Sequence, residues 1–264
     1  MKFKSSDLPC VDVGIEGKSY PLVVDLGSRL EMVVFSEVLG PLPKKPYGTE
    51  KWKNFRGTDY EYPTYLLPKV EVGSFLFKKA IVAEFPTERD KEHVIWSDAT
   101  QEKKSSDEIV GYLGRGLLKK VNLLLDVKRS KLVMTNSPTK LKSDGYDLAA
   151  FEKVPFDLAY KGMVIEADTD LGKVRLLLDT GCTWTMLHEY LYPKDLEKKI
   201  SRYGFPMFTS SQFKMNGIDF GDQMFYFIDI TKELSEFDGF LGMDFIKNHV
   251  MYIDFAKKLL YIQK

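Results

Sequence analysis

The sequence predicts an all-β protein built from two homologous lobes, and two observations carry this prediction. Segments 11–27, 163–181 and 223–230 are rich in β-branched and aromatic residues and are broken by turn signals such as Glu16-Gly17. Three sequence blocks also recur in the same order in the two halves of the chain. Helical periodicity is confined to short stretches such as 36–40 and 188–200, so we expect few helices.

The recurring blocks define the two lobes. At an offset of 154 residues, 22–34 aligns with 176–188 and places Asp25 over Asp179. At an offset of 128 residues, 111–134 aligns with 239–262 and shares two glycines, a leucine and an aspartate. Between these blocks, 69–85 resembles 213–229. We therefore expect an N-terminal lobe at 1–140, an interlobe linker at 141–157 and a C-terminal lobe at 158–264.

The first lobe is longer than the second because of two polar stretches. These lie at 40–50 and 87–108, and their Pro, Gly and charged residues indicate surface loops. The more compact second lobe gives the shorter spacing between the aspartate and the glycine of the later block.

Composition and charge exclude several functions. The 264 residues carry 38 basic and 38 acidic side chains, without a long charged block, so nucleic acid is not an expected partner. The start of the chain has no apolar signal core, and no run of eighteen apolar residues occurs, which predicts a cytoplasmic protein without membrane contact. Export by a route other than Sec stays open. Two distant cysteines fit a reducing compartment.

The histidines indicate neither a metal site nor a cofactor. His93, His188 and His249 lie in unrelated contexts, and no HExxH or CxxC spacing is present. We expect no metal and no cofactor.

The recurring aspartate is the strongest functional signal. Leu176, Leu177 and Leu178 predict a buried strand, and a carboxylate directly after such a strand is costly unless it is satisfied or neutralised. Taken singly, Asp25 or Asp179 is typical of a turn. Taken together, the repeat brings two carboxylates to equivalent places, where two close carboxylates share one proton. Such a pair can activate a water molecule and protonate a leaving amine.

At these residues the sequence resembles the aspartic proteases. Asp179-Thr180-Gly181 and its counterpart at 25–27 are each followed by an apolar-apolar-Gly element, at 112–114 and 240–242. The resemblance implies a bilobal fold with pseudo-twofold symmetry, a single chain of two retropepsin-like lobes, and a monomer that cleaves a peptide or protein substrate. It implies that Asp25 and Asp179 are catalytic. It assigns support of the active-site loops to Gly27, Ser28, Thr180, Gly181, Cys182, Gly114 and Gly242.

The resemblance also implies a hairpin flap over the substrate. In the first lobe it points to the stretch around 53–62, and in the second lobe to 201–208. Glycine at a tip permits the positive φ and the mobility that a lid needs. The alternative is a pair of ordinary surface hairpins. The expected substrate-binding residues are Phe55, Arg56, Gly57, Tyr60, Tyr203 and Gly204.

Two positions depart from the pattern of the family. Leu26 stands where a Thr or Ser hydroxyl usually bonds to the opposite lobe, which opens an alternative function: an impaired protease homologue that binds a peptide or protein. Cys182 stands where a hydroxyl usually supports the ionised aspartate, and a thiol donates only weakly. We therefore expect an activity optimum less acid than that of pepsin, and a maximum below about pH 3.5 would contradict this.

Overall fold

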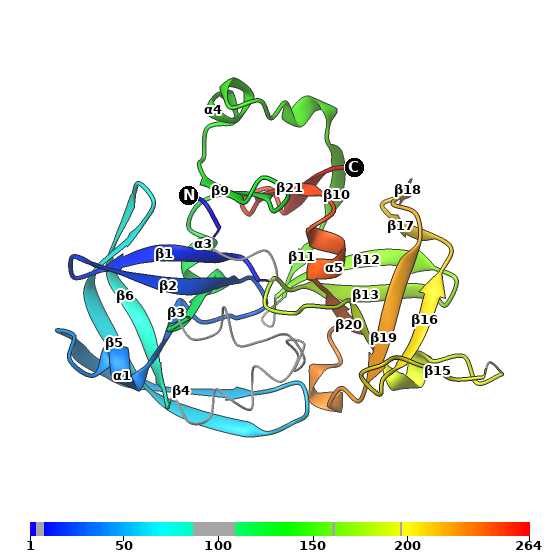
Figure 1. The fold of residues 1–264 in the computed structure, drawn as a ribbon, viewed down its shortest axis with the longest axis horizontal. Helices are drawn as coiled ribbons and strands as arrows, with labels where there is room; N and C mark the ends of the chain where they lie inside the picture. Colours follow the sequence, from blue (N-terminus) through cyan, green and yellow to red (C-terminus); the bar gives the residue numbers. More distant parts are fainter. Residues whose placement is uncertain (4–7, 87–108, 160–161, 196) are drawn as a thin grey trace.

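The computed structural model describes residues 1–3, 8–86, 109–159, 162–195 and 197–264. It consists of two β-rich lobes joined by a third, shared sheet (Figure 1). The all-β bilobal architecture predicted from the sequence is confirmed. The stretch 87–108, expected as a surface loop, lies outside the described residues. In the described part of the chain, no helix is long and apolar enough to cross a lipid bilayer.

The first lobe is a seven-stranded sheet in the order β1-β2-β7-β3-β6-β5-β4, which closes through a further pairing of β1 with β5. Part of the stretch 40–50, expected as a loop, belongs to β4, a largely exposed strand with a bulge at Pro46/Gly48. The elements are β1 (Cys10–Ile15), β2 (Lys18–Asp25), β3 (Met32–Phe35), α1 (Ser36–Leu39), β4 (Lys45–Lys53), β5 (Asp59–Val72), β6 (Phe75–Phe85), β7 (Gly111–Gly114) and α3 (Arg115–Leu118).

The second lobe repeats this order. Its sheet runs β15-β16-β19-β14-β20-β13-β12-β17-β18, with β11 on β12. The sequence repeat matches β2, β7, β3 and β6 with β13, β20, β14 and β19, so the equivalent strands are neighbours in both lobes. The elements are β11 (Asp157–Leu158), β12 (Met163–Thr169), β13 (Gly172–Leu178), β14 (Met186–His188), η3 (Glu189–Leu191), β15 (Lys199–Ile200), β16 (Pro206–Ser210), β17 (Phe213–Met215), β18 (Ile218–Asp219), β19 (Gln223–Ile228), η4 (Lys232–Leu234), β20 (Gly239–Leu241) and α5 (Met243–Ile246).

The third sheet takes strands from both halves of the chain, in the order β10-β22-β21-β8-β9. One of them, β10, lies within 141–157, the expected linker. The boundaries 1–140, 141–157 and 158–264 therefore stay a prediction. The elements are β8 (Leu123–Asp126), β9 (Lys131–Met134), α4 (Pro138–Ser143), η2 (Leu148–Ala150), β10 (Glu152–Pro155), β21 (Val250–Asp254) and β22 (Leu259–Gln263).

The register of the shared sheet reveals the symmetry between the lobes. β8 and β21 are antiparallel, and Leu124 is paired directly with Tyr252. These two residues are also equivalents in the sequence repeat at an offset of 128. A pair of equivalent residues that face each other in an antiparallel ladder lies on a local twofold axis, so the pseudo-twofold axis passes between β8 and β21.

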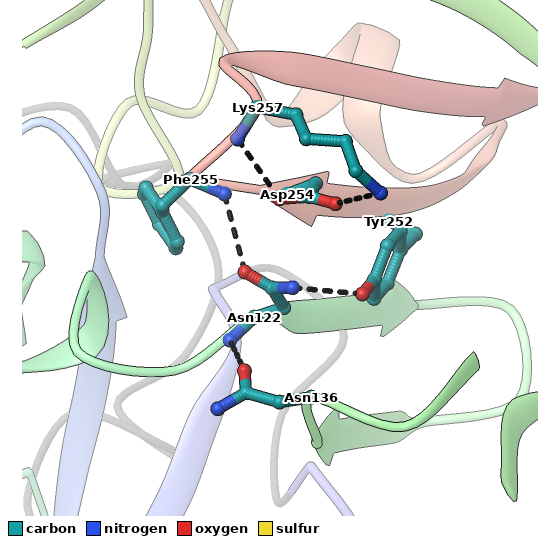
Figure 2. Close-up of polar contacts among 6 residues, drawn as sticks. All are labelled: Asn122, Asn136, Tyr252, Asp254, Phe255 and Lys257. Carbon is teal, nitrogen blue, oxygen red and sulfur yellow. Dashed lines mark hydrogen bonds and ion pairs between the residues drawn. The ribbon is translucent and has the colours of Figure 1, made fainter.

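Asn122 ties the two halves together beside this axis (Figure 2). Its side-chain amide donates to the hydroxyl of Tyr252 at 2.9 Å, and its side-chain oxygen accepts the N–H of Phe255 at 3.2 Å. Its own backbone N–H donates to Asn136 at 2.9 Å. One residue of the first half thus satisfies polar groups of the second.

A continuous apolar core runs through both lobes and beneath the shared sheet. It includes Leu176 and Leu178, which are 0% and 1% exposed, so the strand before Asp179 is buried as its sequence predicts. Leu26 belongs to the same core and is 0% exposed.

Candidate active site

Each recurring aspartate lies at the end of a buried strand, next to a strand inserted from later in the chain. In the first lobe β7 lies between β2 and β3, and Asp25 pairs with Gly114 at the end of β7. In the second lobe β20 lies between β13 and β14, and the N–H of Asp179 donates to the carbonyl of Leu241 at 3.0 Å. The apolar-Gly elements therefore hold the aspartate loops directly.

Gly114 and Gly242 allow this close approach. A Cβ at Gly114 would overlap the carbonyl oxygen of Leu30, and a Cβ at Gly242 would overlap that of Trp184. Because backbone atoms cannot yield as the end of a flexible side chain can, only glycine fits at these two positions.

The two aspartate loops face each other across the boundary between the lobes. A Cβ built at Gly27 would lie 2.5 Å from Cγ of Asp179, and a Cβ built at Gly181 would lie 3.0 Å from Cγ of Asp25. The two carboxyl groups are hydrogen-bonded to each other. The structure thus brings together the aspartates and glycines that the repeat identifies.

Thr180 links the loops across this boundary with a single hydroxyl. Its Oγ1 donates to the carbonyl of Val24 at 2.6 Å and accepts the N–H of Leu26 at 2.9 Å. Leu26, the equivalent residue of the first loop, contributes a buried apolar side chain instead. The expected cross-lobe hydroxyl is therefore present on one side only.

Backbone donors hold the carboxylates within their own loops. The N–H of Ser28 donates to Oδ1 of Asp25 at 2.9 Å, and the N–H of Gly181 donates to Oδ1 of Asp179 at 2.8 Å. The thiol of Cys182 points elsewhere, because its Sγ donates to the carbonyl of Trp184 at 3.0 Å.

The environment separates the proton affinities of the two carboxyls. Burial, followed by the nearby charge of Asp25, raises the pKa of Asp179 to about 8. Burial also raises the pKa of Asp25, but N–H donors from Ser28 and Gly27, the hydrogen bond from Asp179 and the charge of Arg115 oppose this increase. Of the two carboxyls, Asp179 therefore keeps its proton to the higher pH.

Arg115 is a neighbour of the site that the sequence did not single out. It directly follows Gly114, its side chain is 4% exposed, and its charge and that of Asp25 interact. The sequence did contain a signal for this residue: in the repeat at an offset of 128 residues, the charged Arg115 aligns with the apolar Met243.

The first predicted flap is a hairpin of β4 and β5. Phe55, Arg56 and Gly57 form its turn, where Gly57 has φ +86°, and Tyr60 lies on the return strand, stacked on Trp52 with ring centroids 4.8 Å apart. The tip touches the second lobe, because the carbonyl of Phe55 accepts the N–H of Thr231 at 2.7 Å.

The second predicted flap is the shorter hairpin of β15 and β16. Gly204 lies in its turn with φ +84°, and Tyr203 packs on Trp184 with ring centroids 4.5 Å apart. Trp184 also packs on Tyr226 at 5.1 Å. Trp184 is half-buried and lies three residues after Gly181 of the aspartate loop.

A pocket of about 410 Å³ lies where the tip of the first hairpin meets the second lobe. Phe55 and Arg56 line it from the hairpin, and Phe205, Ile228 and Asp229 are among its lining residues from the second lobe. The hairpin tip and the second lobe therefore enclose space together. Whether the flap residues bind substrate stays a prediction.

The architecture is similar to those of solved structures. The aspartic proteinase from Irpex lacteus matches with a TM-score of 0.61 and 11% identity, over 98% of this chain and 94% of that chain. The Basic 7S globulin from soybean matches with a TM-score of 0.60 and 10% identity, over 99% and 92%. No protein-family model matches the sequence, and no curated protein matches it.

At this level of identity the likeness defines the fold and nothing finer. The chain has the pepsin-like aspartic protease fold, as the paired aspartate motifs predict. Its two lobes correspond to the repeat in the sequence, and both aspartates lie where these lobes meet.

Proposed function

We propose that the protein is an aspartic endopeptidase that hydrolyses peptide bonds with a water molecule activated by Asp25 and Asp179. The observation that carries the proposal is the hydrogen-bonded carboxyl pair, one from each lobe, with the pKa of Asp179 raised to about 8. Two carboxyls with separated proton affinities supply a base and an acid together.

In this proposal the two aspartates have different roles. Asp25, whose ionised form is stabilised by N–H donors, accepts a proton from the attacking water as the oxygen adds to the peptide carbonyl carbon. Asp179, which keeps its proton near neutral pH, donates it to the carbonyl oxygen. The carbon–nitrogen bond then breaks as the nitrogen takes up the proton now held by Asp25, and Asp179 takes back a proton from the hydroxyl that becomes the carbonyl of the product. The two carboxyls titrate as a unit, so the roles belong to the pair.

The substrate would bind as an extended strand beneath the hairpin of β4 and β5. Such binding uses main-chain hydrogen bonds, which are independent of sequence, and pockets for alternate side chains. The aromatic residues on the two hairpins, Tyr60 and Tyr203, offer apolar surface for those side chains. A single chain supplies both aspartates, which is consistent with activity as a monomer.

The absence of a hydroxyl at Leu26 supports a second candidate function. A homologue that binds a peptide or protein in the cleft without cleaving it would tolerate a looser connection between the two loops. The buried packing of Leu26 in the common core offsets that loss in part. Retention of both aspartates favours catalysis, since a binding cleft gains little from two carboxyls that must share a proton.

The decisive experiment is cleavage of a diverse peptide library from pH 3 to 8 by wild type, Asp25→Asn and Asp179→Asn. A statine-type transition-state mimic is added in a parallel series. We expect cleavage by wild type only, and inhibition by the mimic. A folded wild type that binds library peptides and cleaves none at any pH would reject the protease and favour the binding module.

A further inference from the structure

The two lobes differ in one buried position, next to the element that pairs with each aspartate loop. Arg115 and Met243 are equivalents in the sequence repeat, and each is the first residue after the apolar-Gly element of its lobe. Their backbones are held in the same way: the N–H of Arg115 donates to the carbonyl of Ser28 at 3.0 Å, and that of Met243 donates to the carbonyl of Cys182 at 2.8 Å. Ser28 and Cys182 are themselves equivalents.

What differs between the two positions is charge. Both side chains are buried, with 4% of Arg115 and 1% of Met243 exposed. A buried guanidinium is costly and stays charged, so its field acts on its surroundings through a medium that screens it poorly. Gly114, the residue before Arg115, is paired with Asp25. The first lobe thus places a cation behind its aspartate where the second lobe places a thioether.

We propose that Arg115 is a positioning residue that biases the pair toward a negative charge on Asp25, by stabilising the ionised form of that carboxyl. In the proposed function, on which this inference rests, Asp25 is then the base and Asp179 the acid. The chemical difference between the two lobes, rather than the bound substrate, breaks the symmetry of the pair.

Among the described residues, Arg29, Cys182 and Asp244 are other charged or titratable groups near the pair. Arg29 faces Arg115 but forms an ion pair with Glu50 and donates to the carbonyl of Lys51 at 2.6 Å. In the second lobe, Cys182 interacts with the charges of Asp179 and Asp244, and Oδ1 of Asp244 accepts from the hydroxyl of Thr185 at 2.7 Å.

The charges support the same direction. The interaction with Arg115 lowers the pKa of Asp25, against the larger opposing effect of burial, whereas the effects that raise the pKa of Asp179 are burial and contacts with Asp25. Arg115 is the weakest of the effects on Asp25, so we expect a modest shift when it is removed.

The test is a carboxyl titration that does not depend on catalysis. Aspartate side chains are labelled with ¹³C and followed by NMR from pH 3 to 9 in wild type, Arg115→Met, Arg115→Lys and Met243→Leu, with Asp25→Asn and Asp179→Asn to assign the signals. Arg115→Met gives the first lobe the residue of the second. We expect the first ionisation of the pair to move up by about one pH unit.

The controls separate charge from packing. Arg115→Lys keeps the charge and should titrate within about 0.3 units of wild type, a small part of the shift that loss of the charge produces. Met243→Leu changes the equivalent buried site without a charge and should leave the titration unchanged. If Arg115→Met does not fold, Arg115→Gln, which is polar and uncharged, replaces it in the same experiment.

Cleavage provides the second readout. The acid limb of the kcat profile should move up with the titration, so Arg115→Met should lose about tenfold in activity one pH unit below the wild-type limb. An unchanged first ionisation in the neutral variants would overturn the inference, as would a loss of activity equal at every pH. If wild type cleaves no peptide, the proposed function fails, while the NMR titration still decides the role of Arg115.

Discussion

The hydroxyl of Thr180 accepts the backbone N–H of Leu26 across the lobe boundary at 2.9 Å, while the side chain of Leu26 offers no hydroxyl in return. The same Thr180 oxygen donates to the carbonyl of Val24 at 2.6 Å. One side chain therefore makes the polar cross-lobe link that two equivalent residues could have shared.

Thr180→Val should destabilise the protein by about 1–3 kcal/mol, because it leaves a buried N–H and a buried carbonyl without their partner. Urea unfolding monitored by fluorescence measures the change. Thr209→Val, at an exposed strand position, is the matched control and should stay within about 0.5 kcal/mol of wild type. Equal effects of the two substitutions would show that the cross-lobe bonds contribute nothing.

Gly27→Ala should separate the two carboxyls, because its Cβ would lie 2.5 Å from Cγ of Asp179. If the pair is catalytic, peptide cleavage should fall by about 100-fold, as expected for a displacement of reacting groups by an ångström. Gly48→Ala, where the nearest atom would be 3.8 Å away, should leave the rate within about twofold, as expected for a surface change. Normal cleavage by Gly27→Ala would show that the loops need not stay in contact.

Stability should fall as pH rises, because the pKa of Asp179 is about 8 in the folded protein and 3.8 is its ordinary value. The folded state then holds the proton more tightly than the unfolded state. The resulting stabilisation is fully present below about pH 4 and is lost as the pH rises through about 8. The free energy of unfolding should decline by at most about 1.4 kcal/mol per pH unit in this range.

Asp179→Asn removes this dependence. In urea titrations, the free energy of unfolding of this variant should therefore rise relative to that of wild type between pH 5 and pH 8. Asp222→Asn, at an exposed position, controls for the loss of a charge and should follow wild type. Parallel curves for Asp179→Asn and wild type would contradict the raised pKa.

Thr231→Pro should loosen the tip of the first hairpin. Thr231 has φ −57°, which proline adopts, so the substitution removes chiefly the N–H that donates to the carbonyl of Phe55. Loss of about 0.5–1.5 kcal/mol should raise the rate of trypsin cleavage after the exposed Arg56 by about two- to tenfold. Thr231→Val keeps the N–H and should leave that rate unchanged. An unaltered rate in Thr231→Pro would mean that the contact does not hold the tip.

Cys182 should react slowly with iodoacetamide at pH 8, because burial and the charge of Asp179 raise the pKa of its thiol well above the ordinary value. Peptide mapping by mass spectrometry should give a rate at least about tenfold below that of the same cysteine in urea. The rate in the folded protein should climb with pH up to about 10. Equal rates in native and unfolded protein would contradict this.

The sequence predicted the parts of the molecule that depend on residue type. Asp25, Asp179 and the two elements ending at Gly114 and Gly242 could be found because buried strand ends and close backbone contacts tolerate few side chains. The short helix expected at 36–40 is present as α1. In the described part of 188–200 the helical element is the short 3₁₀ helix η3, which ends before Pro193, and Lys199–Ile200 form the strand β15.

Other parts depend on contacts that leave little trace in a sequence. The sequence of β10 predicts a linker because the strand has four residues, of which two are charged. These residues gain their strand conformation from pairing with β22. The link from Thr231 to the hairpin uses a backbone N–H that nearly every residue type offers. Arg115 differs from its repeat partner Met243 in charge. Its role could be inferred only from its burial beside Gly114, the residue that pairs with Asp25.

Because Leu124 pairs directly with Tyr252, β8 of the first half and β21 of the second half each complete the hydrogen bonding of the other. A fragment ending before β10 would leave β8 with an open hydrogen-bonding edge, and the complementary fragment would leave β21 in the same state. We expect that neither half unfolds independently in the intact chain, so heating should give one calorimetric transition. Two fragments produced together should reassemble by strand pairing, which would turn this internally repeated protein into a heterodimer.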